Sequence, residues 1–181
     1  MDVMIAGIKG LNMCEGKKVV FWDWVGTLVS SDFFFGYHAK APCGNLMLLE
    51  QANKYARVEN SVSYIPFAWT LVEDFHKMGM KQVIVSNGSL AEVSAQLECA
   101  PFKQFDFVLT ACAYTPKPNT HMFDHALAQL KVEKSEAIFI ADSPVDEVAA
   151  HAADIDFYKV DAHITSYYKI AQVFGFVKQG A

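Results

Sequence analysis

The chain has 181 residues, of which 52% are hydrophobic and 19% are charged, and its formal net charge is −5. This composition favours one folded domain with a sizeable core and argues against long disordered segments. The acidic balance and the lack of any lysine- or arginine-rich run count against a nucleic-acid-binding protein.

The sequence shows no membrane or export signal. No apolar run approaches the ~20 residues that span a bilayer, and the first residues lack the basic stretch of a signal peptide. We expect no transmembrane segment and a soluble, cytoplasmic protein, with export to another cell left open. The cysteines form no CxxC pair, so we expect reduced thiols. They are Cys14, Cys43, Cys99 and Cys112.

Short apolar or aromatic runs alternate along the chain with helical patterns. The runs predict strands at residues 19–22, 82–85, 105–109, 137–140 and 155–160. The helical patterns cover residues 69–78, 90–99, 119–130, 145–153 and 166–174, with Ser89 as an expected N-cap and Gly79 as an expected C-terminal residue. Runs that are apolar on both faces are typical of buried parallel strands. We therefore predict an α/β, Rossmann-like fold: a five-stranded parallel sheet with helices on both faces.

Residues 31–65 do not fit this alternation. An aromatic run at 33–37 is followed by a helical pattern at 45–58. We interpret the segment as a small cap or flap, inserted after the first strand of a single domain that spans residues 1–181. A long crossover helix packed on the sheet is the alternative.

Polar groups follow two of the predicted strands directly. Asp23 ends the first run, and Gly26 three residues later permits an unusual turn. Ser86 ends the second run and begins a Ser-Asn-Gly turn that leads to a helix N-terminus, which suits an anion. In doubly wound sheets the ligand binds beyond the carboxyl ends of the strands, so we expect these groups to meet.

Two further segments add charge to this edge. Lys117 lies between two prolines and is a candidate for neutralising a phosphoryl oxygen. Asp142 and Asp146 flank the start of a helix after the fourth predicted strand. Hard carboxylate oxygens suit Mg²⁺, which usually takes one or two carboxylates together with phosphate and water.

In this order, the four segments resemble the motifs of the haloacid dehalogenase (HAD) superfamily: DxxGT, a Ser or Thr, a Lys, and an acidic DSxxD-type segment. The resemblance covers residues 17–160. It implies a Mg²⁺-dependent hydrolase whose substrate is phosphorylated.

The resemblance also implies roles for individual residues. Asp23 would be the nucleophile that forms an aspartyl-phosphate. The metal would be held by Asp23, Asp142 and the backbone carbonyl of Val25, and Asp146 would support the metal or its water. The implied phosphoryl-binding residues are Ser86, Asn87, Gly88 and the catalytic Lys117.

One position departs from the family pattern. Most HAD phosphatases have a second Asp two residues after the nucleophile, and here that residue is Val25, which cannot transfer a proton. General acid–base help is worth roughly 10²–10⁴-fold. We therefore predict a phosphatase for good leaving groups such as aryl phosphates, with a phosphotyrosine protein as the working hypothesis and the aromatic residues 33–35 packed on the ring. Asp32 and His38 are candidates for a replacement acid.

Two alternatives remain open. The segment Asp-Trp-Val-Gly-Thr is similar to the Asp-Trp-Ala-Gly-Thr of phosphonoacetaldehyde hydrolases, which also use a cap lysine, and here Lys40 and Lys54 are the candidates. Dehalogenases likewise lack the second Asp. The other alternative is a catalytically weak HAD-fold binding module. Substrate identity and oligomeric state are not predicted.

Overall fold

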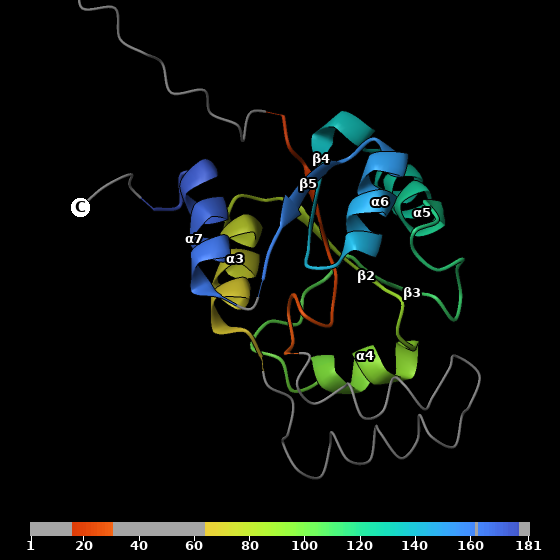
Figure 1. Cartoon of the computed structure of the whole chain (residues 1–181), viewed down its shortest axis with the longest axis horizontal. Coiled ribbons are helices and arrows are strands. Elements are labelled where there is room, and N and C mark those ends of the chain that lie inside the picture. The colour runs from red at the N-terminus through yellow and green to blue at the C-terminus, as the bar shows by residue number, and fades with distance from the viewer. Residues whose placement is uncertain (1–15, 31–63, 162, 178–181) are drawn as a thin grey trace, which may run out of the picture.

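The computed structural model describes residues 16–30, 64–161 and 163–177. Its centre is a parallel five-stranded sheet with strand order β3-β2-β1-β4-β5 (Figure 1). The chain winds outward from the central strand in one direction and then crosses back to build the other half. The strands are β1 (Val19–Trp22), β2 (Lys81–Ser86), β3 (Phe107–Thr110), β4 (Ala137–Ala141) and β5 (Asp156–Lys159). The predicted α/β fold class is confirmed.

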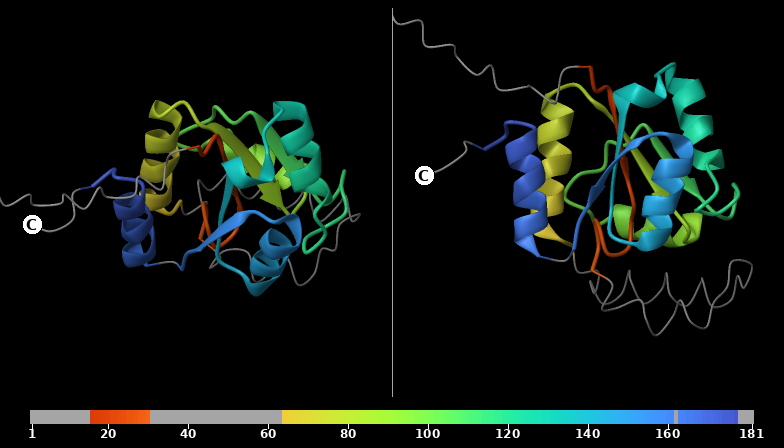
Figure 2. Two further views of the ribbon diagram at one scale, coloured as in Figure 1. Left: turned by 90° about the horizontal axis from the view of Figure 1, so that it is seen from above. Right: turned by 45° about the horizontal axis from the view of Figure 1, so that its top comes forward.

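Helices cover both faces of the sheet. The helices are α3 (Pro66–Lys77), α4 (Leu90–Leu97), α5 (His121–Leu130), α6 (Pro144–Ala153) and α7 (Ile164–Val173), with a short 3₁₀ turn, η2, at Lys134–Glu136. Figure 2 shows α3 and α7 side by side on one face and α5 and α6 on the other. Among the described helices, none is both long and apolar enough to cross a membrane.

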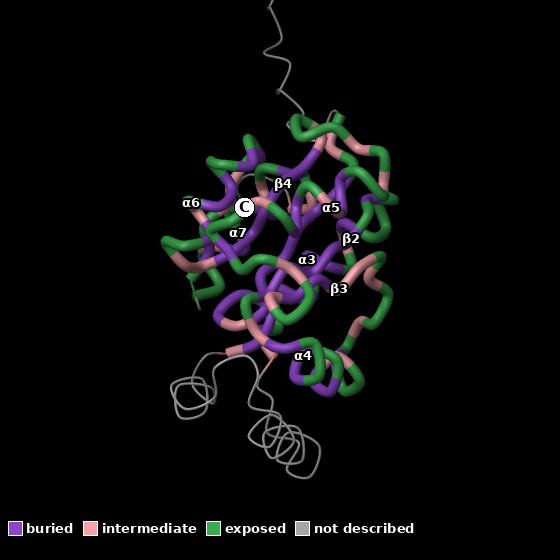
Figure 3. The backbone as a smooth tube through the Cα atoms, turned by 90° about the vertical axis from the view of Figure 1, so that its right-hand side faces the viewer, coloured by how far each residue is buried: buried purple, intermediate pink, exposed green. Residues whose placement is uncertain are grey.

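The alternation of side chains along β1 explains the two layers. Val20 and Trp22 belong to the apolar core beneath α3 and α7, whereas Val19 and Phe21 belong to the core beneath α5 and α6. All four side chains are fully buried, as a central parallel strand requires. In Figure 3 the backbone of the central strands is mostly buried, whereas the helices around them are partly exposed.

Most helix signals in the sequence agree with the observed helices. Ser89 caps α4 by accepting a hydrogen bond from the backbone of Glu92, and Gly79 follows α3 with φ +79°. Helix α3 begins at Pro66, three residues earlier than the apolar pattern indicates. Its N-cap, Ile65, makes no side-chain cap, and the start signal that the sequence does carry is Pro66 at the first helical position.

The predicted cap at residues 31–65 lies outside the described residues except for its last two. Tyr64 pairs with Val29 in an isolated antiparallel bridge, and the backbone N–H of Ile65 donates to the carbonyl of Leu28 at 3.1 Å. The chain thus leaves and rejoins the described domain at neighbouring points beyond β1. Among the described residues, Cys99 and Cys112 are exposed and form no disulfide bond, while Cys14 and Cys43 lie outside the described residues.

Candidate active site

A buried ion cluster lies at the carboxyl edge of the sheet. The ammonium of Lys117 lies 2.6 Å from Oδ1 of Asp23 and 2.5 Å from Oδ1 of Asp146. It also donates to the carbonyl of Val85 at 3.0 Å and lies 5.3 Å above the ring of Phe139. The lysine side chain is only 3% exposed, so both carboxylates contact a desolvated cation.

The register of the strands brings these groups together. Trp22 pairs with Ile84 on β2 and with Ile140 on β4, so Asp23 emerges where all three strands end. Lys117 comes from the loop before α5, and Asp146 lies in the first turn of α6. Three segments that are far apart in sequence therefore share one cluster.

Asn87 holds the backbone of Lys117 from both sides. Its side-chain carbonyl accepts from the Lys117 N–H at 2.8 Å, and its side-chain N–H donates to the Lys117 carbonyl at 3.0 Å. The next peptide bond, Lys117–Pro118, is cis. Sequence reasoning placed Asn87 only against an anion and did not anticipate this positioning contact.

The turn after Asp23 lies in close contact with Asp142. Gly26 has φ +87°, and a Cβ at that position would lie 2.2 Å from Oδ2 of Asp142. The hydroxyl of Thr27 donates to Oδ1 of Asp142 at 3.4 Å. Glycine is thus required here both for its backbone conformation and for space.

The cluster offers a plausible ligand set for a metal ion. Asp23, Asp142 and Asp146 each present a carboxylate oxygen, and these oxygens lie within 4.8 Å of one another. Three carboxylates and one ammonium leave a formal negative charge that a divalent cation would offset. Oxygen-only ligands of this kind fit Mg²⁺. Val25 lies in the adjacent turn, where its carbonyl remains a predicted ligand.

The local electrostatics follow from this crowding. Burial raises the pKa of Asp23 to about 7, and the carboxylates of Asp146 and Asp142 add to the rise, against the opposing attraction of Lys117. Burial, followed by Asp146, also raises the pKa of Asp142. Burial alone would lower the pKa of Lys117, but its attraction to Asp23 and Asp146 raises it, so the ammonium stays charged.

Ser86 and Gly88 form a turn beside this cluster. Ser86 ends β2 with only 3% of its surface exposed, and its hydroxyl accepts from the Gly88 N–H at 3.1 Å. The turn leads into the N-terminus of α4, where the side chain of Ser89 accepts a hydrogen bond from the Glu92 N–H. Its role in holding a phosphoryl group stays a prediction.

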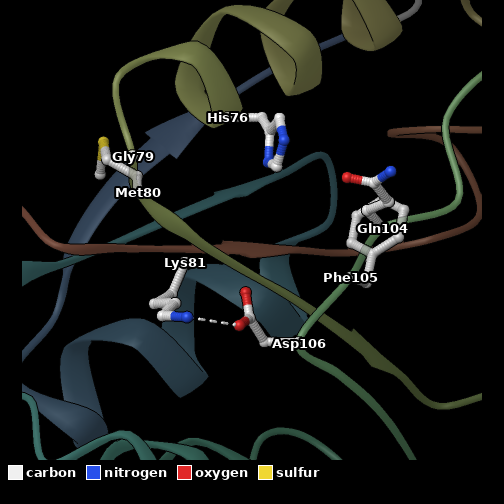
Figure 4. Close-up of a pocket in the computed structure, with 7 residues that line it drawn as sticks. All are labelled: His76, Gly79, Met80, Lys81, Gln104, Phe105 and Asp106. Carbon is white, nitrogen blue, oxygen red and sulfur yellow. Dashed lines mark hydrogen bonds and ion pairs between the residues drawn. The ribbon is translucent and has the colours of Figure 1, made fainter.

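A separate pocket of about 260 Å³ lies at the opposite, amino end of β2 (Figure 4). Its wall includes His76 from α3 and the ion pair between Lys81 and Asp106, with 2.9 Å between their charged atoms. None of the residues that form the acidic cluster lines it. We therefore place the candidate chemistry at the acidic cluster.

A family model described as "Haloacid dehalogenase-like hydrolase" matches residues 35–160, well over half of the chain. The chain belongs to this family. The match includes Ser86, Lys117, Asp142 and Asp146 but begins after Asp23, so the place of Asp23 in the site rests on geometry and on the motif in the sequence. A comparison with curated proteins finds no match.

Solved structures of other proteins have the same fold. CbbY from Rhodobacter sphaeroides in complex with phosphate has a TM-score of 0.65 and 16% identity, over 82% of this chain and 88% of that one. A HAD-superfamily hydrolase from Ehrlichia chaffeensis has a TM-score of 0.63 and 20% identity, with 88% and 98% covered. A hydrolase from Pseudomonas syringae has a TM-score of 0.63 and 18% identity, with 84% and 90% covered. At these identities the likeness establishes the fold.

Near this HAD site, Thr27 and Trp24 were given no individual role from sequence. Thr27 contacts Asp142, and Ser143 caps α6 while its hydroxyl donates to Oδ2 of Asp146 at 2.5 Å. The indole of Trp24 donates to the side chain of Gln96 on α4. The Asp-Ser segment signalled the cap of α6, but no local pattern links Trp24 to a residue so distant in sequence.

We predict that Gly26→Ala weakens Mg²⁺ binding and lowers stability more than a positive φ alone explains. The left-handed region costs a non-glycine residue about 1–2 kcal/mol, and at this position the new Cβ also displaces Asp142. Urea unfolding and calorimetric Mg²⁺ titration measure the two effects.

The matched control is Gly79→Ala. Gly79 has φ +79°, but a Cβ there would meet no atom within 4 Å. This variant should show the backbone cost alone and bind Mg²⁺ as the wild type does. Equal effects of the two substitutions would contradict the close approach of the turn to Asp142.

Proposed function

We propose that this HAD hydrolase is a Mg²⁺-dependent phosphatase that transfers the phosphoryl group of its substrate to Asp23. The observation that carries the proposal is the buried contact of Asp23 with Lys117, beside two further carboxylates at the same edge of the sheet. A carboxylate, an ammonium and a plausible metal-ligand set thus lie within one cluster.

In the proposed reaction, an Asp23 oxygen attacks phosphorus while the bond from phosphorus to the leaving oxygen breaks. The leaving oxygen takes up a proton, and water then hydrolyses the aspartyl-phosphate, which releases phosphate and regenerates Asp23.

Lys117 keeps the nucleophile oriented and offsets negative charge on the transferring group. Bound Mg²⁺, held by Asp23, Asp142 and the Val25 carbonyl, would supply further charge neutralisation. Asp146 holds Lys117, and Ser86, Asn87 and Gly88 face the phosphoryl group.

The leaving group defines the expected substrate class. Val25 occupies the position at which most family members carry an acid, and its side chain donates no proton. A phenol, with a pKa of about 10, departs far more readily without an acid than an alkyl alcohol does. We therefore favour aryl phosphates, including phosphotyrosine in a protein, as substrates.

The alternatives are less well supported by the site. The acidic trio favours a metal-dependent phosphatase over a dehalogenase, which needs no Mg²⁺. A phosphonate hydrolase would need a Schiff-base lysine, and both candidates, Lys40 and Lys54, lie outside the described residues. A catalytically weak binding module would function equally well without the Asp23 carboxylate.

The first test is a phosphatase panel with and without Mg²⁺. We expect aryl phosphates and phosphotyrosine peptides to turn over at least about 10²-fold faster than alkyl phosphates, because no acid assists the alkyl leaving group. Removal of Mg²⁺ with a chelator should abolish turnover. Equal rates on aryl and alkyl esters would contradict the leaving-group argument.

In the same assay, Asp23→Asn should lower the rate by at least about a thousand-fold, because it removes the nucleophile. Asp154→Asn is the matched control: Asp154 is exposed at the end of α6 with φ +58°, a conformation that Asn tolerates. This control should keep full activity. An active Asp23→Asn variant would contradict the proposed intermediate.

We also predict that Mg²⁺ binding depends on pH below neutrality. The pKa of Asp23 rises from 3.8 to about 7 on folding. Between these two pH values, Asp23 is protonated in the metal-free folded protein but ionised in the unfolded chain. Through this group, stability falls as the pH rises from about 4 to about 7. Mg²⁺ affinity should therefore increase up to about pH 7 and then level off, with proton release on binding at lower pH. Calorimetric titration in buffers of different ionisation enthalpy measures the Mg²⁺ affinity and the number of protons released on binding. A pH-independent affinity would refute the prediction.

A further inference from the structure

One buried hydroxyl near the site has no part in the chemistry proposed above. Tyr167 lies on α7, which packs beside α3 (Figure 1), and only 1% of its surface is exposed. Its hydroxyl donates to the backbone carbonyl of Thr27 at 2.8 Å, across 140 positions of sequence. A buried hydroxyl is costly unless it is hydrogen-bonded, so this contact fixes where the ring and the carbonyl lie.

The carbonyl belongs to the turn that carries the metal-facing backbone. This turn is closed by hydrogen bonds from the Gly26 N–H to the Val29 carbonyl at 2.7 Å and from the Leu28 N–H to the Trp24 carbonyl at 2.9 Å. The turn contacts Tyr167 through the backbone carbonyl of Thr27 and lies close to Asp142 at Gly26.

Thr27 joins the two contacts. Its backbone carbonyl accepts from Tyr167, while its side-chain hydroxyl donates to Asp142 at 3.4 Å. The residue is fully buried, so neither polar atom can turn to water. A shift of the Thr27 peptide would therefore displace the hydroxyl that contacts Asp142, within the same short hydrogen-bonded turn that contains Val25.

We propose that Tyr167 is a positioning residue for the metal site, which acts by holding the turn of residues 24–29 against Asp142. The inference rests on the Mg²⁺ site proposed above and adds to it a residue from the last helix. Burial raises the pKa of the Tyr167 phenol, and Asp142, Asp161 and Asp23 add to the rise, so the hydroxyl keeps its proton and remains a donor. Loss of a group that orients a metal ligand typically lowers metal affinity by about 10–100-fold.

The test compares Tyr167→Phe with Tyr168→Phe. Tyr168 is the next residue on α7 and is 46% exposed, so its variant removes a hydroxyl from the same helix without touching the turn. Mg²⁺ affinity is measured by calorimetry on each protein without substrate, and the urea midpoint reports global stability. We expect Tyr167→Phe to bind Mg²⁺ about tenfold or more weakly while remaining folded, and Tyr168→Phe to match the wild type.

A double-mutant cycle with Thr27→Val separates positioning from general loss of stability. Thr27→Val keeps the backbone carbonyl that accepts from Tyr167 and removes the side-chain hydroxyl that donates to Asp142. If Tyr167 acts by positioning this hydroxyl, the two substitutions together should weaken Mg²⁺ binding by less than the product of their separate effects. Backbone N–H exchange at Gly26 and Leu28 should quicken in Tyr167→Phe even without metal.

The outcomes distinguish the two proposals. A wild type that binds Mg²⁺ and a Tyr167→Phe variant that binds it equally would overturn the role of Tyr167 alone. Additive effects in the cycle, or a loss of affinity that Tyr168→Phe shares, would also overturn it. A wild type that binds no Mg²⁺ would overturn the proposed metal site, and the role of Tyr167 with it.

Discussion

The buried ammonium of Lys117 between Asp23 and Asp146 is the contact on which the rest of the site depends. An unpaired buried charge costs several kcal/mol, of the order of 3–5 kcal/mol when one partner is removed. Lys117 lies before α5, Asp23 after β1 and Asp146 within α6. Because separating these charges is costly, the contact holds three distant parts of the chain together. Asn87 then fixes the lysine backbone from the end of β2.

This cluster contains fewer positive than negative groups: the ammonium of Lys117 against three carboxylates. Lys117 offsets one carboxylate, yet Asp23, Asp142 and Asp146 all converge. Burial raises the pKa of Asp23, and the carboxylates of Asp146 and Asp142 add to the rise. The capped N-terminus of α6, with its partial positive charge, helps to hold Asp146. A divalent cation would complete the charge balance and return Asp23 to the ionised form that can attack phosphorus. In this account, metal binding and activation of the nucleophile are one electrostatic event.

The sequence predicted the parts of this arrangement that parallel strands determine. Asp23, Ser86 and Asp142 follow buried apolar runs, and the carboxyl ends of such runs meet at one edge of a doubly wound sheet. Lys117 lies in a loop, so the two flanking prolines and the order of the family motifs were the signals that pointed to it.

Other features had no local signal. The start of α3 was placed too late because Ile65 provides no side-chain cap, although Pro66 at the first helical position is itself a start signal. Two contacts depend on how helices pack against the turn after β1: Tyr167 on α7 with Thr27, and Gln96 on α4 with Trp24. Side-chain periodicity shows which face of a helix is buried but not which residues that face contacts. The two hydrogen bonds from the Asn87 side chain to the backbone of Lys117 were not predicted for the same reason, since Lys117 lies in another loop.

The most direct measurement of the central claim is a crystal structure of the protein grown with Mn²⁺ in place of Mg²⁺, with the ion located by anomalous scattering. We predict one anomalous peak in contact with carboxylate oxygens of Asp23 and Asp142, with Lys117 still bound to Asp146. A peak elsewhere on the molecule, or none at this edge of the sheet, would contradict the account.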